Sequence, residues 1–301
     1  MKSAYKLDNL NYSKMNLLIM KKYLIYKKNK KYMSLIHRLE KDLENFTKIK
    51  KDVYPESHKK FNIDELLSLS AKFFYDLSPS YFSLIETIAH SHTSVVEIED
   101  NKKRAGHSIY KSDTNTTNII IQDKCDYGKL IVLIHELSHN CANLKRNVTN
   151  SYYTELQSIY FQLTASEYFN DQFETNKFYN INLDYFMYLR ELCQTLITIE
   201  KFLKIWKRKP YNENNKNYYE NKLDIDIDII NDIINYNLET DLKYILSFLA
   251  SVELMCENEL KEEILYNSLF MEDKSIENIL KLSKNVKSYL NRQYALVGGK
   301  K

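Results

Sequence analysis

Glycine and proline are rare in this chain: its 301 residues include only four glycines and three prolines. Both residues interrupt regular structure, so their scarcity leaves long stretches in which an α-helix can continue. Many of these stretches also repeat apolar residues at helical spacing, and the sequence therefore predicts a mostly helical protein. Apolar residues make up 44% of the chain, which is enough for a sizeable core.

The chain also lacks a C-x-x-C pair, and its four cysteines are widely spaced. This spacing does not indicate a disulfide framework and favours free thiols in a reducing compartment. No apolar run is long enough to span a membrane or to form the core of a signal peptide. We therefore expect a cytoplasmic protein with no membrane partner.

A strong excess of one charge is missing as well, because 43 basic and 40 acidic residues give a formal net charge of +3. This balance does not indicate a nucleic-acid partner. The lysine clusters between residues 21 and 51 are interpreted as solvated helix faces. The sequence leaves the oligomeric state open.

What the chain does contain is a histidine pair after an apolar run. Residues 130–139 read LIVLIHELSH and include the pattern H-E-x-x-H. His135 and His139 are four residues apart and lie on one face of a helix, where both imidazoles can bind one metal ion. Glu136 is offset by about 100° and stands beside the metal, where a general base takes a proton from metal-bound water.

An ordinary helix can carry the same pattern by chance, in on the order of one in a hundred chains of this length. The apolar residues at 130–134 favour the metal site instead. They predict that the helix is buried on most sides, and polar groups that follow a buried run are costly without partners. One zinc ion is such a partner for the two histidines.

A catalytic zinc ion usually has three protein ligands, and this pattern supplies two. Glu155 lies sixteen residues after His139, in the first turn of the next predicted helix. An antiparallel helix pair would bring it back toward the metal. Glu167, about three turns further along, is the alternative third ligand. A further alternative is that Glu155 merely favours the helix N-terminus through the helix dipole.

Apolar periodicity in the rest of the sequence predicts helices and one small sheet. Helical spacing is found in two stretches before residue 60 and in the ranges 63–78, 80–90, 126–146, 152–169, 183–207, 224–236, 239–258, 259–270 and 274–291. Residues 211–219 are predicted to form a polar loop. Strand signals at 95–98, 106–110 and 118–121 predict a small β-sheet at about 95–121 beside the H-E-x-x-H helix. An edge of that sheet could hold an extended peptide.

Residues 103–155 resemble the catalytic core of the oligoendopeptidase F and thimet oligopeptidase family of zinc peptidases. KRAGHS at 103–108 resembles the family's lysine-arginine-x-glycine segment, and NIII at 118–121 resembles its next strand. HELSH at 135–139 matches the family's H-E-x-x-H. ELQS at 155–158 resembles its E-x-x-S segment.

The resemblance implies a mainly α, helical metallopeptidase fold with a deep cleft, one zinc ion and a peptide substrate. It supports Glu155 as the third ligand and makes Gly106 and His107 candidate substrate contacts. It also implies an oxyanion-stabilising donor on a late helix, where Tyr244 is the best match and Tyr236 is a candidate substrate contact. The alternative for Tyr244 is a tyrosine packed in a helix interface, because the chain has 25 tyrosines.

The main prediction is a zinc metalloendopeptidase with an N-terminal helical segment, 1–60, and a catalytic domain, 61–301. His135, His139 and Glu155 would bind zinc, and Glu136 would assist attack of the bound water on a peptide bond.

Departures from the family leave two alternatives. No histidine precedes the late tyrosine where the family has one, and the chain is about half the family's length. A non-catalytic relative that keeps zinc and binds peptides is the first alternative. A metal hydrolase with a non-peptide substrate is the second.

Overall fold

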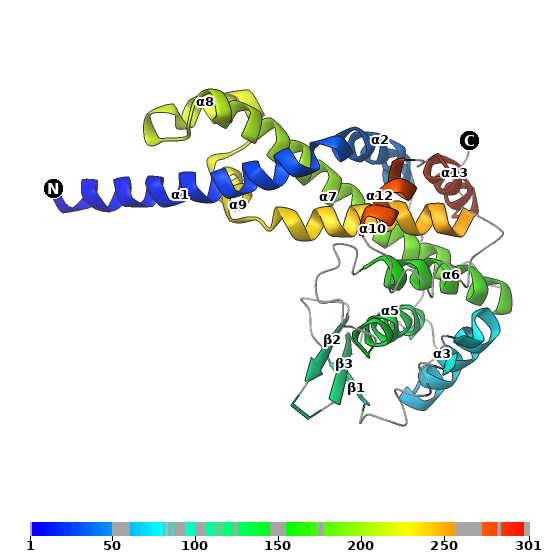
Figure 1. Ribbon diagram of the computed structural model, residues 1–301. Helices are drawn as coiled ribbons and strands as arrows, with labels where there is room; N and C mark the ends of the chain where they lie inside the picture. The colour runs from blue at the N-terminus through cyan, green and yellow to red at the C-terminus, as the bar shows by residue number, and fades with distance from the viewer. Residues whose placement is uncertain are drawn as a thin grey trace. The chain divides into compact units, whose positions relative to one another are not determined.

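Helices make up most of the structure, and a single small sheet accompanies them among the described residues (Figure 1). This confirms the mainly α fold class with a small β-sheet. The computed structural model describes residues 2–49, 61–80, 82–83, 86, 94–99, 106–111, 113–114, 116–122, 126–144, 155–173, 177–256, 273–281 and 284–297. The helix predicted at 80–90 lies largely outside these residues, and the one at 259–270 lies wholly outside them.

The elements follow one another in an almost entirely helical order. The α-helices are α1 (Lys2–Asn29), α2 (Met33–Leu43), α3 (Ile63–Leu77), α5 (Asp126–Leu144), α6 (Leu156–Gln172), α7 (Lys177–Arg208), α8 (Lys216–Leu223), α9 (Ile227–Asn235), α10 (Leu238–Cys256), α12 (Asp273–Lys281) and α13 (Val286–Leu296). Three 3-10 helices are η1 (Lys30–Tyr32), η2 (Glu44–Lys48) and η3 (Glu213–Asn215). The strands are β1 (Ser94–Glu99), β2 (Gly106–Lys111) and β3 (Thr116–Gln122).

Contacts group the chain into two units. Unit 1 comprises Met1–Glu44 and Tyr188–Ile245, and unit 2 comprises Asn45–Met187 and Leu246–Lys301. The boundaries of these units differ from the division near residue 60 that the sequence indicates. The difference arises because the N-terminal helices pack against the middle of the chain. Tyr26 of α1 and His37 of α2, for example, both contact Glu200 of α7.

Unit 2 is built around α5. Strands β2 and β3 pack on this helix, as do α3 and α6 (Figure 1). Four apolar side chains of α5 are at most 1% exposed: Leu130, Ile131, Leu133 and Ile134. The burial predicted for the apolar run before the two histidines is therefore confirmed.

The sheet has the strand order β1-β3-β2, with β1 parallel and β2 antiparallel to β3. Along β3, Thr117, Ile119 and Ile121 are buried while the residues between them are partly exposed. Side chains alternate between the two faces of a strand, so one face of β3 is the core face. The small sheet predicted beside the H-E-x-x-H helix is thus confirmed.

Helix α3 begins with a reciprocal cap and joins an aromatic core. The Asn62 side chain accepts a hydrogen bond from the Glu65 backbone N–H, and the Glu65 carboxylate accepts one from the Asn62 N–H, each at 2.9 Å. Further along, Phe73 and Phe74 lie edge-to-face against Phe161 of α6. This packing joins the two helices that flank α5.

The polar loop predicted at 211–219 is wrong in part, because this segment contains η3 and the start of α8. Tyr211 and Tyr219 are buried against Phe202 of α7, and the Tyr219 hydroxyl donates to the Lys209 carbonyl. The tyrosines therefore behave as core residues with a polar end, which a reading of the segment as polar overlooks.

The single helix predicted at 274–291 is also wrong, because the structure has α12 and α13 there, with a break before Asn285. The Glu253 carboxylate of α10 accepts hydrogen bonds from the Asn285 backbone N–H at 2.8 Å and from its side-chain amide at 2.9 Å. This contact from another helix holds the N-terminus of α13 in place, and local periodicity contains no sign of it.

Two further expectations concern membrane spans and thiols. Among the described helices, none is both long and apolar enough to cross a membrane. Of the cysteines whose side chains are described, neither Cys193 nor Cys256 forms a disulfide bond. Cys125 lies outside the described residues.

A buried carboxylate joins three helices of unit 1. Glu200 of α7 is 5% exposed. It accepts hydrogen bonds from the Tyr26 hydroxyl at 3.1 Å and the Lys204 ammonium at 2.9 Å, and it lies 2.9 Å from His37 Nε2. Burial raises the pKa of Glu200, but its bonds to His37, Lys204 and Tyr26 outweigh burial, so the net shift is downward.

Replacing Glu200 with Gln should lower the free energy of unfolding by about 2 kcal/mol at neutral pH, because charged hydrogen bonds are lost in a buried position. The lowered pKa means that the stabilisation is present above the unfolded-state value near 4.5 and is lost as the pH falls through the folded-state pKa. Urea unfolding followed by the fluorescence of Trp206, on the same helix, measures both effects. The exposed Glu191→Gln on α7 is the control, and equal stability of the two variants would contradict this role.

Candidate metal centre

Two histidines of α5 meet on one face of the helix. His135 and His139 are four residues apart, and their Nε2 atoms are 3.1 Å apart. Their side chains are 13% and 19% exposed, so both rings are largely removed from solvent while keeping some access to it. The spacing of the sequence motif therefore brings two ligand atoms to one point in the structure.

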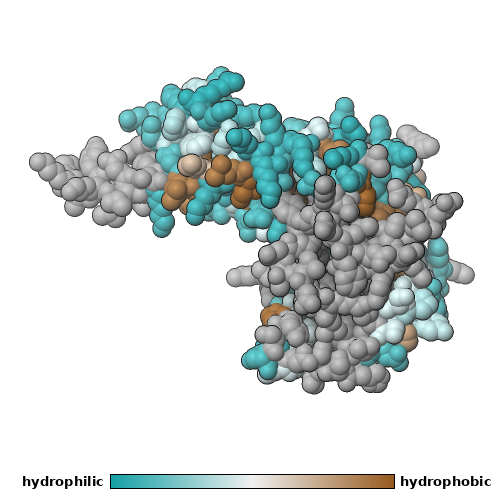
Figure 2. Space-filling view, in the orientation of Figure 1, coloured by the Kyte–Doolittle hydropathy of each residue, from teal (hydrophilic) through white to brown (hydrophobic). Residues whose placement is uncertain are grey.

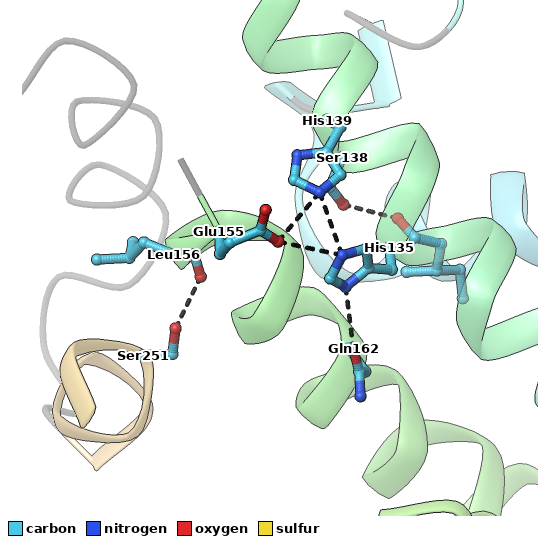
Figure 3. Close-up of polar contacts among 8 residues, drawn as sticks. His135, Ser138, His139, Glu155, Leu156, Gln162 and Ser251 are labelled. Carbon is cyan, nitrogen blue, oxygen red and sulfur yellow. Dashed lines mark hydrogen bonds and ion pairs between the residues drawn. The ribbon is translucent and has the colours of Figure 1, made fainter. Parts of the chain in front are cut away.

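Glu155 reaches the same point from the next helix. It occupies the position just before α6, and its Oε2 lies 3.4 Å from His135 Nε2 and 3.2 Å from His139 Nε2 (Figure 3). The Ser251 hydroxyl of α10 donates to the Leu156 carbonyl at 2.7 Å, which fixes the backbone next to Glu155. One ligand atom from each of the three residues lies within 4.8 Å of the other two.

These distances fit a single zinc ion. Ligand atoms bound at about 2.0–2.1 Å in tetrahedral geometry lie about 3.4 Å apart, and the three measured separations are 3.1, 3.2 and 3.4 Å. Glu155 Oε2 is buried and makes no aligned hydrogen bond. A cation between the three atoms would supply the partner that this oxygen needs. The residues therefore fit the zinc ion that the sequence predicts.

The electrostatics also favour a cation. Burial raises the pKa of Glu155, but the two histidines beside it outweigh burial and hold the pKa well below its usual value. Burial lowers the pKa of His135, whereas Glu155 and Glu136 raise it, and the net shift is upward. Both shifts report an ionised carboxylate next to two imidazoles, an arrangement that stabilises added positive charge.

Gln162 orients the first histidine, and sequence reasoning missed it. Its side-chain Oε1 lies 3.0 Å from His135 Nδ1, on the side of the ring away from the cluster (Figure 3). An amide oxygen only accepts, so Nδ1 carries the proton and the Nε2 lone pair faces Glu155 and His139. Its spacing in the sequence could have indicated this role. Gln162 follows Glu155 by seven residues, or about two helical turns, so the two residues lie on the same side of the helix.

Glu136 is buried between α5 and the sheet. It is 6% exposed and follows His135 directly on the helix. A Cβ built on Gly106 of β2 would lie 3.4 Å from Glu136 Cγ and 2.4 Å from Val132 Cγ1. The strand can therefore approach the helix this closely only because residue 106 has no side chain. Gly106 thus determines how β2 lies against Glu136.

His107 lies on the other face of the sheet. In the antiparallel register Gly106 pairs with Ile121, whereas His107 pairs with Ile120. Paired residues share a face, and Ile121 is buried toward α5 while Ile120 is partly exposed. Of the two candidate substrate contacts in this strand, the structure brings Gly106 next to Glu136 and directs His107 away from α5.

One of the other candidate residues, Glu167, has different partners from the cluster, and the two late tyrosines belong to the other unit. Glu167, the alternative third ligand, pairs with Arg292 of α13 at 2.7 Å and accepts from Gln293 at 3.0 Å. Tyr236 and Tyr244 belong to unit 1, whereas the cluster belongs to unit 2. The oxyanion role of Tyr244 and the substrate contact of Tyr236 stay predictions.

Ser138, the fourth residue of the H-E-x-x-H pattern, is accommodated inside the helix. Its side chain is fully buried, and its hydroxyl donates to the Ile134 carbonyl at 2.7 Å. The hydroxyl is thus satisfied within α5 and takes no part in the cluster.

Comparisons with protein-family models, with curated proteins and with solved structures give no match. The geometry of the site and the sequence motifs are therefore the only basis for assigning a function.

Gly106→Ala should destabilise the protein by about 1–3 kcal/mol, because the new methyl group overlaps Val132 Cγ1. Adding Val132→Ala removes the overlapping atom and should recover part of the loss. Thermal or urea unfolding of both single variants and the double variant measures this coupling. Strictly additive effects would show that β2 does not pack on α5 through this contact.

Gln162→Leu should weaken zinc binding about tenfold or more, because His135 loses the acceptor that fixes its tautomer and ring orientation. Competition with a chromogenic chelator measures the zinc affinity. The exposed Gln172→Leu on the same helix is the matched control and should bind zinc like the wild type. Equal affinities of the two variants would exclude this role for Gln162.

Proposed function

We propose that this protein is a zinc-dependent metalloendopeptidase. The observation that carries the proposal is the convergence of His135 Nε2, His139 Nε2 and Glu155 Oε2, with Glu136 adjacent on the same helix. Two imidazoles and one carboxylate are a ligand set of catalytic zinc sites, in which a fourth position is left for water or substrate. Imidazole ligands and the measured separations favour zinc over a hard cation such as Mg²⁺.

The proposed fold is a short, divergent form of the helical metallopeptidase fold of the oligoendopeptidase F and thimet oligopeptidase family. Three features of unit 2 support it: a buried H-E-x-x-H helix, a small sheet against that helix, and a glutamate at the start of the following helix. These features correspond to segments on which the sequence resemblance is based.

When bound, zinc polarises the substrate carbonyl and lowers the pKa of a water molecule. The Glu136 carboxylate accepts a proton from the attacking water while the water oxygen bonds to the carbonyl carbon of the substrate. The same carboxyl group then returns the proton to the leaving amine as the C–N bond breaks. Burial of Glu136 limits competing hydration of its carboxylate.

A peptide in extended conformation is the substrate that best suits the sheet. Strand β2 is at one edge of the three-stranded sheet, and Gly106 at its start lies against Glu136. An edge strand presents backbone N–H and C=O groups to which an extended peptide can pair. A peptide on β2 would therefore pass beside the general base. By resemblance Tyr244 is the proposed oxyanion donor and Tyr236 a proposed substrate contact.

Glu136→Gln should abolish peptide cleavage while zinc stays bound, because the amide keeps the shape of the side chain but cannot take up the proton. Zinc-loaded wild type and variant are incubated with a mixed peptide library. Mass spectrometry then identifies the products, and elemental analysis measures bound zinc. We expect cleavage by the wild type alone, with one zinc ion in each protein.

Two matched carboxylates serve as controls. Glu155→Gln should lose zinc, whereas Glu167→Gln should keep both zinc and cleavage because Glu167 pairs with Arg292 instead. Wild-type-like cleavage by Glu136→Gln would contradict the mechanism. Zinc in the wild type without cleavage of any peptide would favour a peptide-binding relative or a hydrolase with another substrate.

A further inference from the structure

The first two helices carry an unusual local charge. No aspartate or glutamate occurs from Asn9 to Leu39, whereas the same segment contains one arginine and seven lysines. The lysines are Lys14, Lys21, Lys22, Lys27, Lys28, Lys30 and Lys31. A segment with eight positive charges and no negative ones therefore stands in a chain whose overall charges nearly balance.

The solvent-exposed face of α1 also carries large apolar side chains. Leu17, Met20 and Leu24 are 56%, 50% and 55% exposed. Their spacing of three and four residues aligns them in one stripe along the helix. Single exposed apolar residues are common on proteins, but three aligned on one helix form a surface feature.

This stripe is not the core-facing side of α1. Among the described side chains of α1, the apolar Ile19 and Tyr26 are buried, as are the polar Lys22 and Asn29, and Tyr26 reaches Glu200. Asn16 accepts from the Trp206 indole N–H at 2.7 Å, and the Tyr23 ring lies 5.9 Å from that indole. These contacts to α7 fix the rotation of the helix, so the stripe is directed outward as a consequence of the packing in unit 1.

Exposed lysines border the stripe. On a helix of 3.6 residues per turn, Lys14 and Lys21 lie on one side of it and Lys27 on the other, and Lys28 extends the same face toward η1. Figure 2 shows hydrophobic surface among hydrophilic surface where α1 and α9 lie. Apolar side chains between lysines are typical of helices that lie in the plane of a membrane surface.

We propose that this face of α1 binds an anionic lipid surface, with Leu17, Met20 and Leu24 entering the interface between the lipid headgroups and the acyl chains. The exposed lysines would pair with the lipid phosphates and carboxylates. The expectation of no membrane partner considered only spanning segments, and a helix that lies on the surface needs none. The proposal is independent of the peptidase activity.

Charge complementarity favours an anionic lipid surface over two other partners, a second copy of the chain and a nucleic acid. A second copy of the chain on the stripe would bring lysines against lysines, which opposes association. A nucleic acid would satisfy the lysines, but phosphates gain nothing from three exposed aliphatic side chains between them. An anionic lipid surface satisfies both the charged and the apolar side chains.

The test is co-sedimentation of the full chain with vesicles of phosphatidylcholine alone or with about 30% phosphatidylserine. The wild type should bind the anionic vesicles and not the neutral ones, and added salt should weaken binding. Both L17Q/M20Q/L24Q and K21E/K28E should lower the partition coefficient at least about tenfold, because lipid binding scales with buried apolar area and with each basic residue.

Matched controls use exposed residues elsewhere in the chain. L67Q/L296Q removes two apolar side chains, and K201E/K207E reverses two charges on α7. Both should bind like the wild type. The fluorescence of Trp206, which packs on α1, and circular dichroism confirm that every variant is folded.

Three results would overturn the proposal. The first is a wild type that binds neither kind of vesicle. The second is unchanged binding by L17Q/M20Q/L24Q, which would leave the stripe without a role. The third is transfer RNA that displaces the protein from vesicles and binds L17Q/M20Q/L24Q as tightly as the wild type, since this would make the face a nucleic-acid surface.

Discussion

Placement of two histidines and a glutamate in a buried, apolar helix is the constraint on which unit 2 depends. Helix α5 places His135, Glu136 and His139 directly after residues that are at most 1% exposed. Such groups are costly in a core unless partners reach them. The chain supplies those partners from α6, where Glu155 approaches both Nε2 atoms and Gln162 accepts from the far side of one ring. A cation at the centre would complete the set.

The elements around α5 are arranged so that this constraint can be met. Gly106 lets β2 lie against Val132 and Glu136, and the contact of Ser251 with the Leu156 carbonyl fixes the turn that carries Glu155. Neither contact touches the ligand atoms themselves. Instead, the two contacts set the position of the backbone segments that carry or cover the cluster. Errors of about 1 Å in such positions are enough to weaken a binding site.

Unit 1 depends on a different buried group. Glu200 draws donors from three helices to one carboxylate, and Trp206 with Asn16 fixes the rotation of α1 beside it. The same packing that buries Ile19 and Tyr26 leaves Leu17, Met20 and Leu24 outside. An outward apolar stripe among lysines is therefore a property of the packed unit. The composition of α1 alone does not distinguish a helix with an exposed apolar stripe from a helix that is buried on two sides.

The sequence by itself determined the helical class, the three strands, and the histidine pair with Glu136, because these depend on periods of two or about 3.6 residues. It also narrowed the candidates for a third zinc ligand to two glutamates. Only the tertiary structure distinguishes their positions, since Glu167 pairs with Arg292 and Glu155 lies beside the histidines. Tertiary contacts also decided the role of Gln162, the break before Asn285 and the helix at Tyr219. Each of these depends on a partner distant along the chain, which local periodicity does not record.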